Sequence, residues 1–180
     1  MALHRICKAT SDDETLLAYH EAGHVVMGYM LGFALHSQGV DINQVDGGGT
    51  TYFCDAYTPI VIHTIVGDKE KFVLERMMIR EVCVSLAGQL AEDLYNKKKK
   101  RFDFGSQDGI DVVAAVAKTL SCSEEFAKWF CVLSVPEARN YLKKEWNTVD
   151  LIAQKLLKKK RLTGKQLGAL LAKTETKVLE

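Results

Sequence analysis

The sequence of 180 residues contains little proline and no long apolar run. Its two prolines are Pro59 and Pro136, so most of the chain is free to form long helices. A membrane-spanning helix needs about 20 consecutive apolar residues, and the apolar run 60–66 is far shorter, so no membrane segment is expected. The formal net charge of +1 provides no overall field that would attract nucleic acid. The composition is that of an ordinary globular protein, and we expect a single domain over residues 1–180.

Cysteine is present, but not in a pattern that indicates disulfides or a cysteine-bound metal. The five cysteines are an odd number, and none forms a Cys-x-x-Cys pair. The N-terminus does not have the pattern of a secretory signal peptide. These features predict a reducing, intracellular and cytoplasmic setting. Three cysteines lie in apolar surroundings and are expected in the core: Cys83, Cys122 and Cys131.

The most informative segment is His20-Glu21-Ala22-Gly23-His24, which lies in an apolar stretch compatible with a helix. Residues four apart point to the same side of a helix, so His20 and His24 can both bind one zinc ion. Glu21 would then lie beside the metal without binding it and could take a proton from a metal-activated water. The alternative is a helix with two half-buried histidines and a surface glutamate.

A catalytic zinc usually has three protein ligands, so the two histidines require a third partner. The other histidines are poor candidates, because His4 lies in a loosely ordered segment, His36 closely follows the first helix and His63 lies in an apolar run. The position six residues after His24 is Met30. A downstream carboxylate remains, and the candidates are Glu92, Asp108 and Asp111.

Hydrophobic spacing predicts a mainly helical (α+β) fold with one small β-hairpin. The hairpin comprises residues 39–45 and 50–54, joined by a glycine-rich turn that lacks the spacing of a phosphate-binding loop. Residues 102–107 are expected to form a loop, and residues 55–68 show no clear pattern. Helices are predicted over 13–33, 69–96, 108–120, a short segment around Trp129, 136–160 and 164–173. Residues 1–13 are expected to be a loosely ordered lead-in, and 174–180 a tail.

A run of five cations, Lys97-Lys98-Lys99-Lys100-Arg101, follows the second of these helices. Such a run could contact RNA, phospholipid or an acidic partner. A solvated helix end that complements the helix dipole explains it as well. One short run and a near-zero net charge favour the second interpretation, so no nucleic-acid partner is expected.

Residues 18–26, Ala-Tyr-His-Glu-Ala-Gly-His-Val-Val, resemble the opening helix of the peptidase domain of FtsH-type zinc proteases. Three further segments are similar to that domain, in the same order. Residues 85–93 resemble its Gly-Gly-Arg-Ala-Ala-Glu-Glu helix, residues 105–108 its loop that carries the third zinc ligand, and residues 156–167 its terminal helix and turn. The resemblance covers about residues 15–172.

The resemblance implies a helical zinc-peptidase domain in which His20, His24 and Asp108 bind zinc and Glu21 is the catalytic base. It favours Asp108 over Asp111, because the family's apolar helix positions, counted from Asp108, fall on Val112, Ala115, Val116 and Leu120. Glu92 would hold the other ring nitrogen of a histidine. The loop departs from the family pattern, since it is one residue shorter before the aspartate, and Gly109 replaces an apolar residue.

These features predict a zinc-dependent endopeptidase that acts on unfolded or loosely folded polypeptides. The sequence lacks the Gly-x-x-x-x-Gly-Lys-Ser/Thr loop of the ATPase that accompanies this domain in the family, so a separate ATPase or self-assembly into an oligomer is an expected partnership. Strand 50–54 could pair with substrate as an additional strand. The alternative is a module that keeps the fold without catalysis and serves in binding or assembly.

Overall fold

The computed structural model describes residues 3–5, 9–10, 14–43, 48–54, 68–97 and 104–179. Their helices are α1 (Glu14–Met30), α3 (Asp68–Tyr95), α4 (Gln107–Leu120), α5 (Glu124–Lys144), α6 (Trp146–Lys159) and α7 (Gly164–Lys173). Their strands are β1 (Leu3–Arg5), β2 (Ala9–Thr10), β3 (Leu35–Asp41), β4 (Gly48–Cys54) and β5 (Arg161–Leu162). The described part is thus mainly helical with a small antiparallel sheet, as the hydrophobic spacing predicts.

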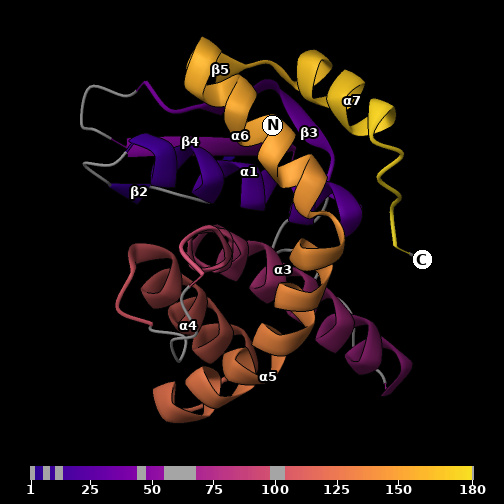
Figure 1. Ribbon diagram of the computed structural model, residues 1–180. Coiled ribbons are helices and arrows are strands. Elements are labelled where there is room, and N and C mark those ends of the chain that lie inside the picture. Colours follow the sequence, from indigo (N-terminus) through magenta and orange to yellow (C-terminus); the bar gives the residue numbers. More distant parts are fainter. Residues whose placement is uncertain are drawn as a thin grey trace.

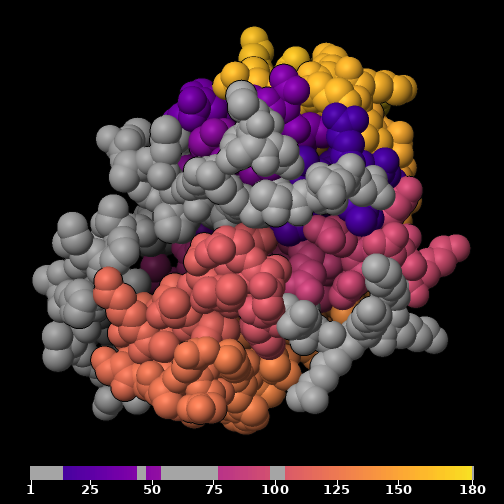
Figure 2. Space-filling model, turned by 90° about the vertical axis from the view of Figure 1, so that its left-hand side faces the viewer, coloured from indigo at the N-terminus to yellow at the C-terminus, as the bar shows by residue number. Residues whose placement is uncertain are grey.

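The central element is α1, which lies between the sheet and the helices α3, α4 and α5 (Figure 1). It packs most extensively against α3 and α6, and it also contacts β3 and β4. Because it is enclosed from several sides, 13 of its 17 residues are buried. Figure 2 shows one face of the molecule, with α7 and neighbouring residues at the top and α4 and α5 below. The motif helix is therefore a core helix rather than a surface one.

The sheet has the strand order β1-β4-β3-β5, and β2 also pairs with β4. β3 and β4 form a hairpin, but its first strand spans Leu35–Asp41 rather than the predicted residues 39–45. Its pairing has an irregularity between Leu35 and Val40. Gly39 lies in this irregularity with a φ of 71°, and a side chain there would collide with the carbonyl oxygen of Leu162. Glycine at this position lets β5 approach β3 closely.

Strand β4 has neighbours on both edges, which corrects the expectation that residues 50–54 offer a free edge. β1 pairs with Tyr52–Cys54 and β2 with Gly48–Gly49. Both strands belong to the segment expected to be a loosely ordered lead-in. Hydrophobic alternation cannot predict them, because strands of two and three residues are too short to show it.

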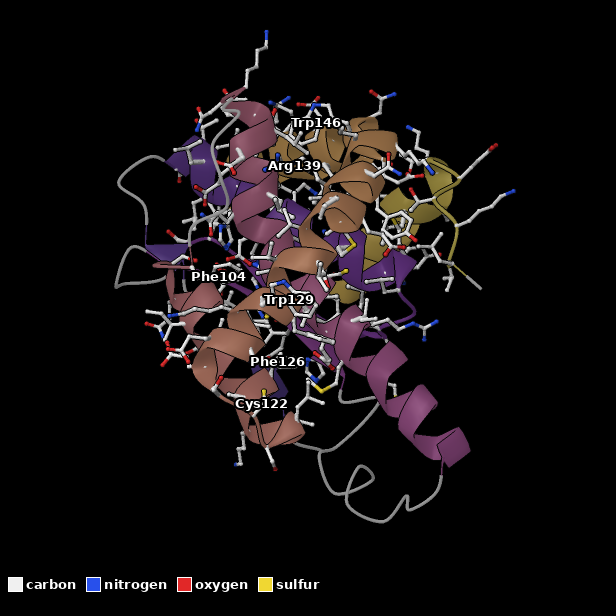
Figure 3. The ribbon with its side chains drawn as sticks, turned by 90° about the horizontal axis from the view of Figure 1, so that it is seen from below. Phe104, Cys122, Phe126, Trp129, Arg139 and Trp146 are labelled. Carbon is white, nitrogen blue, oxygen red and sulfur yellow. The ribbon has the colours of Figure 1, made fainter. Side chains whose placement is uncertain are left out.

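Helix α5 is continuous through Pro136, so the prediction that a helix begins there and runs to residue 160 is wrong. One buried stripe spans the proline: Ala127, Cys131, Ser134, Ala138 and Leu142. Pro136 and the residue four before it, Val132, are both exposed, so water can reach the carbonyl that the proline leaves unpaired. The helix ends instead at Lys144, and α6 begins two residues later at Trp146. Figure 3 shows Phe126 and Trp129 along α5, where both are exposed.

The remaining expectations fall partly within the described residues. Cys83 and Cys131 are buried, and Cys122 is half-buried against the core. In the expected tail, the backbone N–H of Leu179 donates to the carbonyl of Met30 at 2.7 Å. Residues 55–67, with His63, and the cations 98–101 lie outside the described residues. None of the helices in the described ranges is both long and apolar enough to cross a membrane.

Helices α1 and α3 meet at Gly23, where there is no room for a side chain. A β-carbon at this position would lie 2.6 Å from the carbonyl oxygen of Ala87 and 2.7 Å from the β-carbon of Ala91. Replacing Gly23 with alanine would add about 1 kcal/mol of helix propensity, but the new β-carbon would clash with the backbone of α3. Gly23 sets the distance between the two helices.

Substituting Gly23→Ala should therefore lower the free energy of unfolding, by roughly 1–3 kcal/mol, as overpacking does elsewhere. Gly168→Ala is the matched control, because Gly168 is also helical and no atom lies within 4 Å of a β-carbon there. This control should gain about 0.5–1 kcal/mol from helix propensity. Urea denaturation of both metal-free variants measures the difference. Equal stabilisation by the two substitutions would contradict the close contact.

Candidate metal centre

Helix α1 places His20 and His24 one turn apart on the side that faces α3 and α4. Both side chains are buried, with 3% and 0% of their surface exposed. Their ring centroids are 4.8 Å apart, and the two Nε2 atoms approach to 3.0 Å. Polar rings buried this deeply require partners for every nitrogen.

The tautomer of His24 follows from its partner on α3. Its Nδ1 lies 2.7 Å from the backbone carbonyl oxygen of Val84. A carbonyl can only accept a hydrogen bond, so Nδ1 carries the proton and donates it. In the neutral ring, Nε2 then presents a lone pair towards His20.

His20 is held in the same way by a carboxylate. Its Nδ1 donates to Oε1 of Glu92 over 2.6 Å, and Glu92 also belongs to α3. Its Nε2 lies 3.0 Å from Oδ2 of Asp108. With Nδ1 occupied, the neutral ring directs the lone pair of Nε2 at both Asp108 and His24.

Asp108 enters the cluster from the first turn of α4. Ser106 caps this helix by accepting from the N–H of Gly109 at 3.2 Å, and its hydroxyl donates to Gln89 of α3 at 3.1 Å. A β-carbon at Gly109 would lie 2.8 Å from Cα of Phe104, so the tight loop explains why a glycine replaces the expected apolar residue. These contacts hold Asp108 close to both histidines.

Of the three carboxylates left open by the sequence, Asp108 alone joins both histidines. It is 5% exposed, and its Oδ2 lies 3.5 Å from Nε2 of His24 as well as 3.0 Å from that of His20. Glu92 contacts His20 through Nδ1, the nitrogen that faces away from the cluster. Asp111 is exposed and accepts a hydrogen bond from Gln107 at 2.7 Å. The structure therefore brings together His20, His24 and Asp108.

These three donors fit a metal ion. The distances between the donor atoms are 3.0, 3.0 and 3.5 Å, close to the roughly 3.3 Å that separates ligands around a tetrahedral ion with bonds of 2.0–2.2 Å. Two ring lone pairs and one carboxylate converge on the same point, and such an arrangement repels itself without a proton or a cation between them. Among the described residues, this is the group of histidine, cysteine and acidic side chains that could hold a metal.

The charges of the metal-free cluster are strongly coupled. Burial lowers the pKa of His20, but hydrogen bonds with Asp108 and Glu92 and the charges of Glu21 and Asp108 outweigh it and raise the pKa to about 10. Burial raises the pKa of Asp108, while the hydrogen bonds and charges of His20 and His24 lower it well below its usual range. The metal-free site thus holds a proton on His20 in the place where a cation would bind.

Glu21 is fully buried beside this cluster, between α1 and β4. The Thr51 hydroxyl donates to its Oε2 at 2.5 Å, while its Oε1 has no hydrogen-bond partner in the structure. A β-carbon at Gly49 would lie 2.5 Å from Oε1, so glycine there makes room for the carboxylate. Burial raises the pKa of Glu21, against the lowering effect of His20, His24 and the Thr51 hydroxyl. A buried carboxylate with one fixed and one unpartnered oxygen is suited to accept a proton.

Sequence reasoning missed the groups that hold the expected residues in place. A backbone carbonyl such as that of Val84 leaves no trace in residue types, and Thr51 looked like an ordinary strand residue. Gly88 had a signal, because it lies in the small-residue stretch 85–91. A β-carbon at Gly88 would lie 2.3 Å from Nε2 of His20, so this glycine keeps α3 clear of the donor atoms.

No protein-family model matches the chain, and no curated protein shows significant similarity to it. The geometry by itself gives a buried three-donor cluster suitable for a metal and an adjacent carboxylate.

Asp108→Asn should abolish tight metal binding, because it removes the one anionic donor of the cluster. Asp111→Asn is the matched control, since Asp111 is three residues away on the same helix and exposed. Metal content after purification without chelators, together with calorimetric titration of the metal-free proteins, measures both. Loss of binding in both variants, or in neither, would contradict the assignment of Asp108.

The raised pKa of His20 predicts how the metal-free protein responds to pH. Because the folded value of about 10 lies above the ordinary 6.5, the folded state retains a proton that the unfolded state releases. The resulting stability is complete below the unfolded pKa and is lost as pH rises towards the folded one. We expect the free energy of unfolding to fall from pH 6.5 to about 8.5 in the chelator-treated protein.

An NMR titration of the imidazole signals, assigned with His20→Gln, tests this directly. The ring of His20 should remain doubly protonated at about pH 8.5, where an unperturbed histidine is neutral. A midpoint close to the ordinary value would show that Asp108 and Glu92 do not hold a proton on this ring.

Proposed function

We propose that this protein is a zinc-dependent endopeptidase that hydrolyses peptide bonds in unfolded or loosely folded polypeptides. The observation that carries the proposal is Glu21, whose unpartnered Oε1 lies buried beside a three-donor cluster. An unpaired buried polar atom costs about 1–3 kcal/mol, so it persists where function requires it. A metal site with a purely structural role needs no such group.

Zinc is the ion that this donor set suits best. Imidazole nitrogens and one carboxylate oxygen are ligands that zinc accepts, and three protein ligands leave one position open in catalytic zinc sites. The alternative of a closed structural site would call for a fourth protein ligand. Among the described residues, no fourth donor joins His20, His24 and Asp108 in the cluster.

Zinc bound at these donors supplies Lewis-acid chemistry, because it polarises a peptide carbonyl and lowers the pKa of a water molecule to about 7. The residues of the chain transfer the proton and orient the metal ligands. Oε1 of Glu21 accepts the proton of the attacking water and later passes it to the leaving amine, while Thr51 fixes the other oxygen. Val84 and Glu92 keep the ring nitrogens of His24 and His20 directed at the metal.

The resemblance to the FtsH-type peptidase domain supports the same reaction and extends it to polypeptide substrates. It also suggests an ATPase as the partner that unfolds stable substrates, and self-assembly into a homo-oligomer. A cytoplasmic location agrees with the unpaired buried cysteines in the described part of the chain. The competing function is a non-catalytic binding module that retains the metal cluster.

Glu21→Gln should lower the rate of casein hydrolysis by roughly 10²–10⁴-fold, which is the usual contribution of a general base. Zinc content should remain at about one ion per chain, because Glu21 is not among the three donors. The control is Glu125→Gln, an exposed glutamate at the start of α5, which should retain both activity and zinc.

Two outcomes would decide against the proposal. Full activity in Glu21→Gln would remove this residue from the reaction. A zinc-loaded wild-type protein that cleaves neither casein nor unstructured peptides would favour the non-catalytic module.

A further inference from the structure

The edge of β4 opposite β3 is occupied by the chain's own N-terminal segment. β1 pairs antiparallel with β4, with Leu3 opposite Cys54 and Arg5 opposite Tyr52. β2 pairs antiparallel farther along, with Ala9 opposite Gly49. β1 pairs with the end of β4 and β2 with its beginning, as expected for one segment that runs antiparallel to β4. Both strands therefore lie along the edge that β3 does not use.

Strand β2 lies beside β4 and α1, the two elements that enclose Glu21 of the candidate site (Figure 1). Its partner Gly49 is the residue whose backbone lies against the carboxylate of Glu21. β2 also packs against α1, the helix that carries His20, Glu21 and His24. A strand in this position runs past the catalytic base of the proposed reaction.

The pairing of this segment is short and interrupted. β1 has 3 residues and β2 has 2. From Arg5 to Ala9 the segment advances by one residue more than β4 does from Tyr52 to Gly49, so the register shifts between the two strands. Each backbone hydrogen bond adds only about 0.5–1.5 kcal/mol net, so another strand that offers the same bonds can replace this ladder.

We propose that β1 and β2 occupy the surface on which an extended polypeptide pairs, and that this segment competes with substrate for β4. The inference rests on the proposed function for the nature of the substrate. An added strand is recognised chiefly through main-chain hydrogen bonds, so a polypeptide of varied sequence can take the same antiparallel position. A segment tethered by a short linker has an effective concentration in the millimolar range, which makes it a strong competitor.

The competition predicts a specific kinetic pattern. Substrate must displace the segment to pair with β4, which raises KM. Once the substrate is paired, the residues that carry the reaction are unchanged, so kcat stays the same.

A disulfide between β1 and β4 tests the proposal in the full chain. Residues opposite each other in antiparallel strands have Cα atoms about 4.5–5.5 Å apart, within the range of a disulfide. Leu3→Cys would therefore pair with the native Cys54 under oxidised glutathione. Cys7→Ser is included throughout to remove a competing thiol. Arg5→Cys is the matched control, because its partner is Tyr52.

Binding is measured with a fluorescent unstructured peptide in the Glu21→Gln background, which prevents cleavage. Closing the disulfide should weaken peptide binding by about tenfold or more, since the tethered segment can no longer leave. Reduction should restore binding, and Arg5→Cys should respond to neither treatment. Failure of the disulfide to form, or unchanged peptide binding after it forms, would overturn the proposal.

A second variant covers the case in which the crosslinked protein does not fold. Ala9→Pro weakens the pairing of β2, because proline cannot donate a backbone hydrogen bond. It should strengthen peptide binding several-fold, and weaker or unchanged binding would count against competition. If peptide binding weakens when the disulfide closes and recovers on reduction, but the wild type cleaves no substrate, the proposed peptidase function fails while the competition for β4 stands.

Discussion

The structure depends on the close approach of α1 and α3. Gly23 of α1 leaves no room for a β-carbon against the backbone of Ala87, and Gly88 of α3 leaves none against the two histidine rings. Small residues on both helices thus set a separation at which α3 can supply polar partners to α1. Val84 and Glu92 each contact the outward ring nitrogen of one histidine. A larger separation would leave the Nδ1 atoms of both rings buried without a hydrogen-bond partner.

This separation also determines which atoms converge. Once the Nδ1 atoms are engaged by α3, both Nε2 atoms and Oδ2 of Asp108 face a single point. The electrostatic cost of this arrangement is relieved by a proton on His20 in the metal-free protein, and a divalent ion would relieve it more fully. Metal affinity should therefore be coupled to folding, because the unfolded chain cannot gather donors from two separate helices. The metal-free cluster lowers the stability of the fold, and binding of a metal ion would raise it.

The sequence identified the chemical groups of the site better than their supports. The spacing of His20 and His24 is sufficient to place two donors on one helical face, whereas the choice of Asp108 over Asp111 depends on the family resemblance. The carbonyl of Val84 could not be predicted, because every residue has one. At Pro136, local propensity predicts a helix start, but the buried stripe of α5 continues across the proline and keeps the helix intact. β1 and β2 cannot be predicted from local pattern, because their pairing depends on β4, which lies about 40 to 50 residues away along the chain.

The contact between α1 and β4 explains why exchange would occur at the edge of β4 rather than by movement of the strand itself. Two glycines fit reciprocally: Gly28 of α1 faces the ring of Phe53, and Gly49 of β4 faces the carboxylate of Glu21. Thr51 lies between Gly49 and Phe53 on the same face of β4 and donates to Glu21. Sliding β4 by one residue would turn all three positions to the opposite face and remove the support of the base. The face of β4 must therefore remain fixed on α1, and only its outer edge is free to change partners.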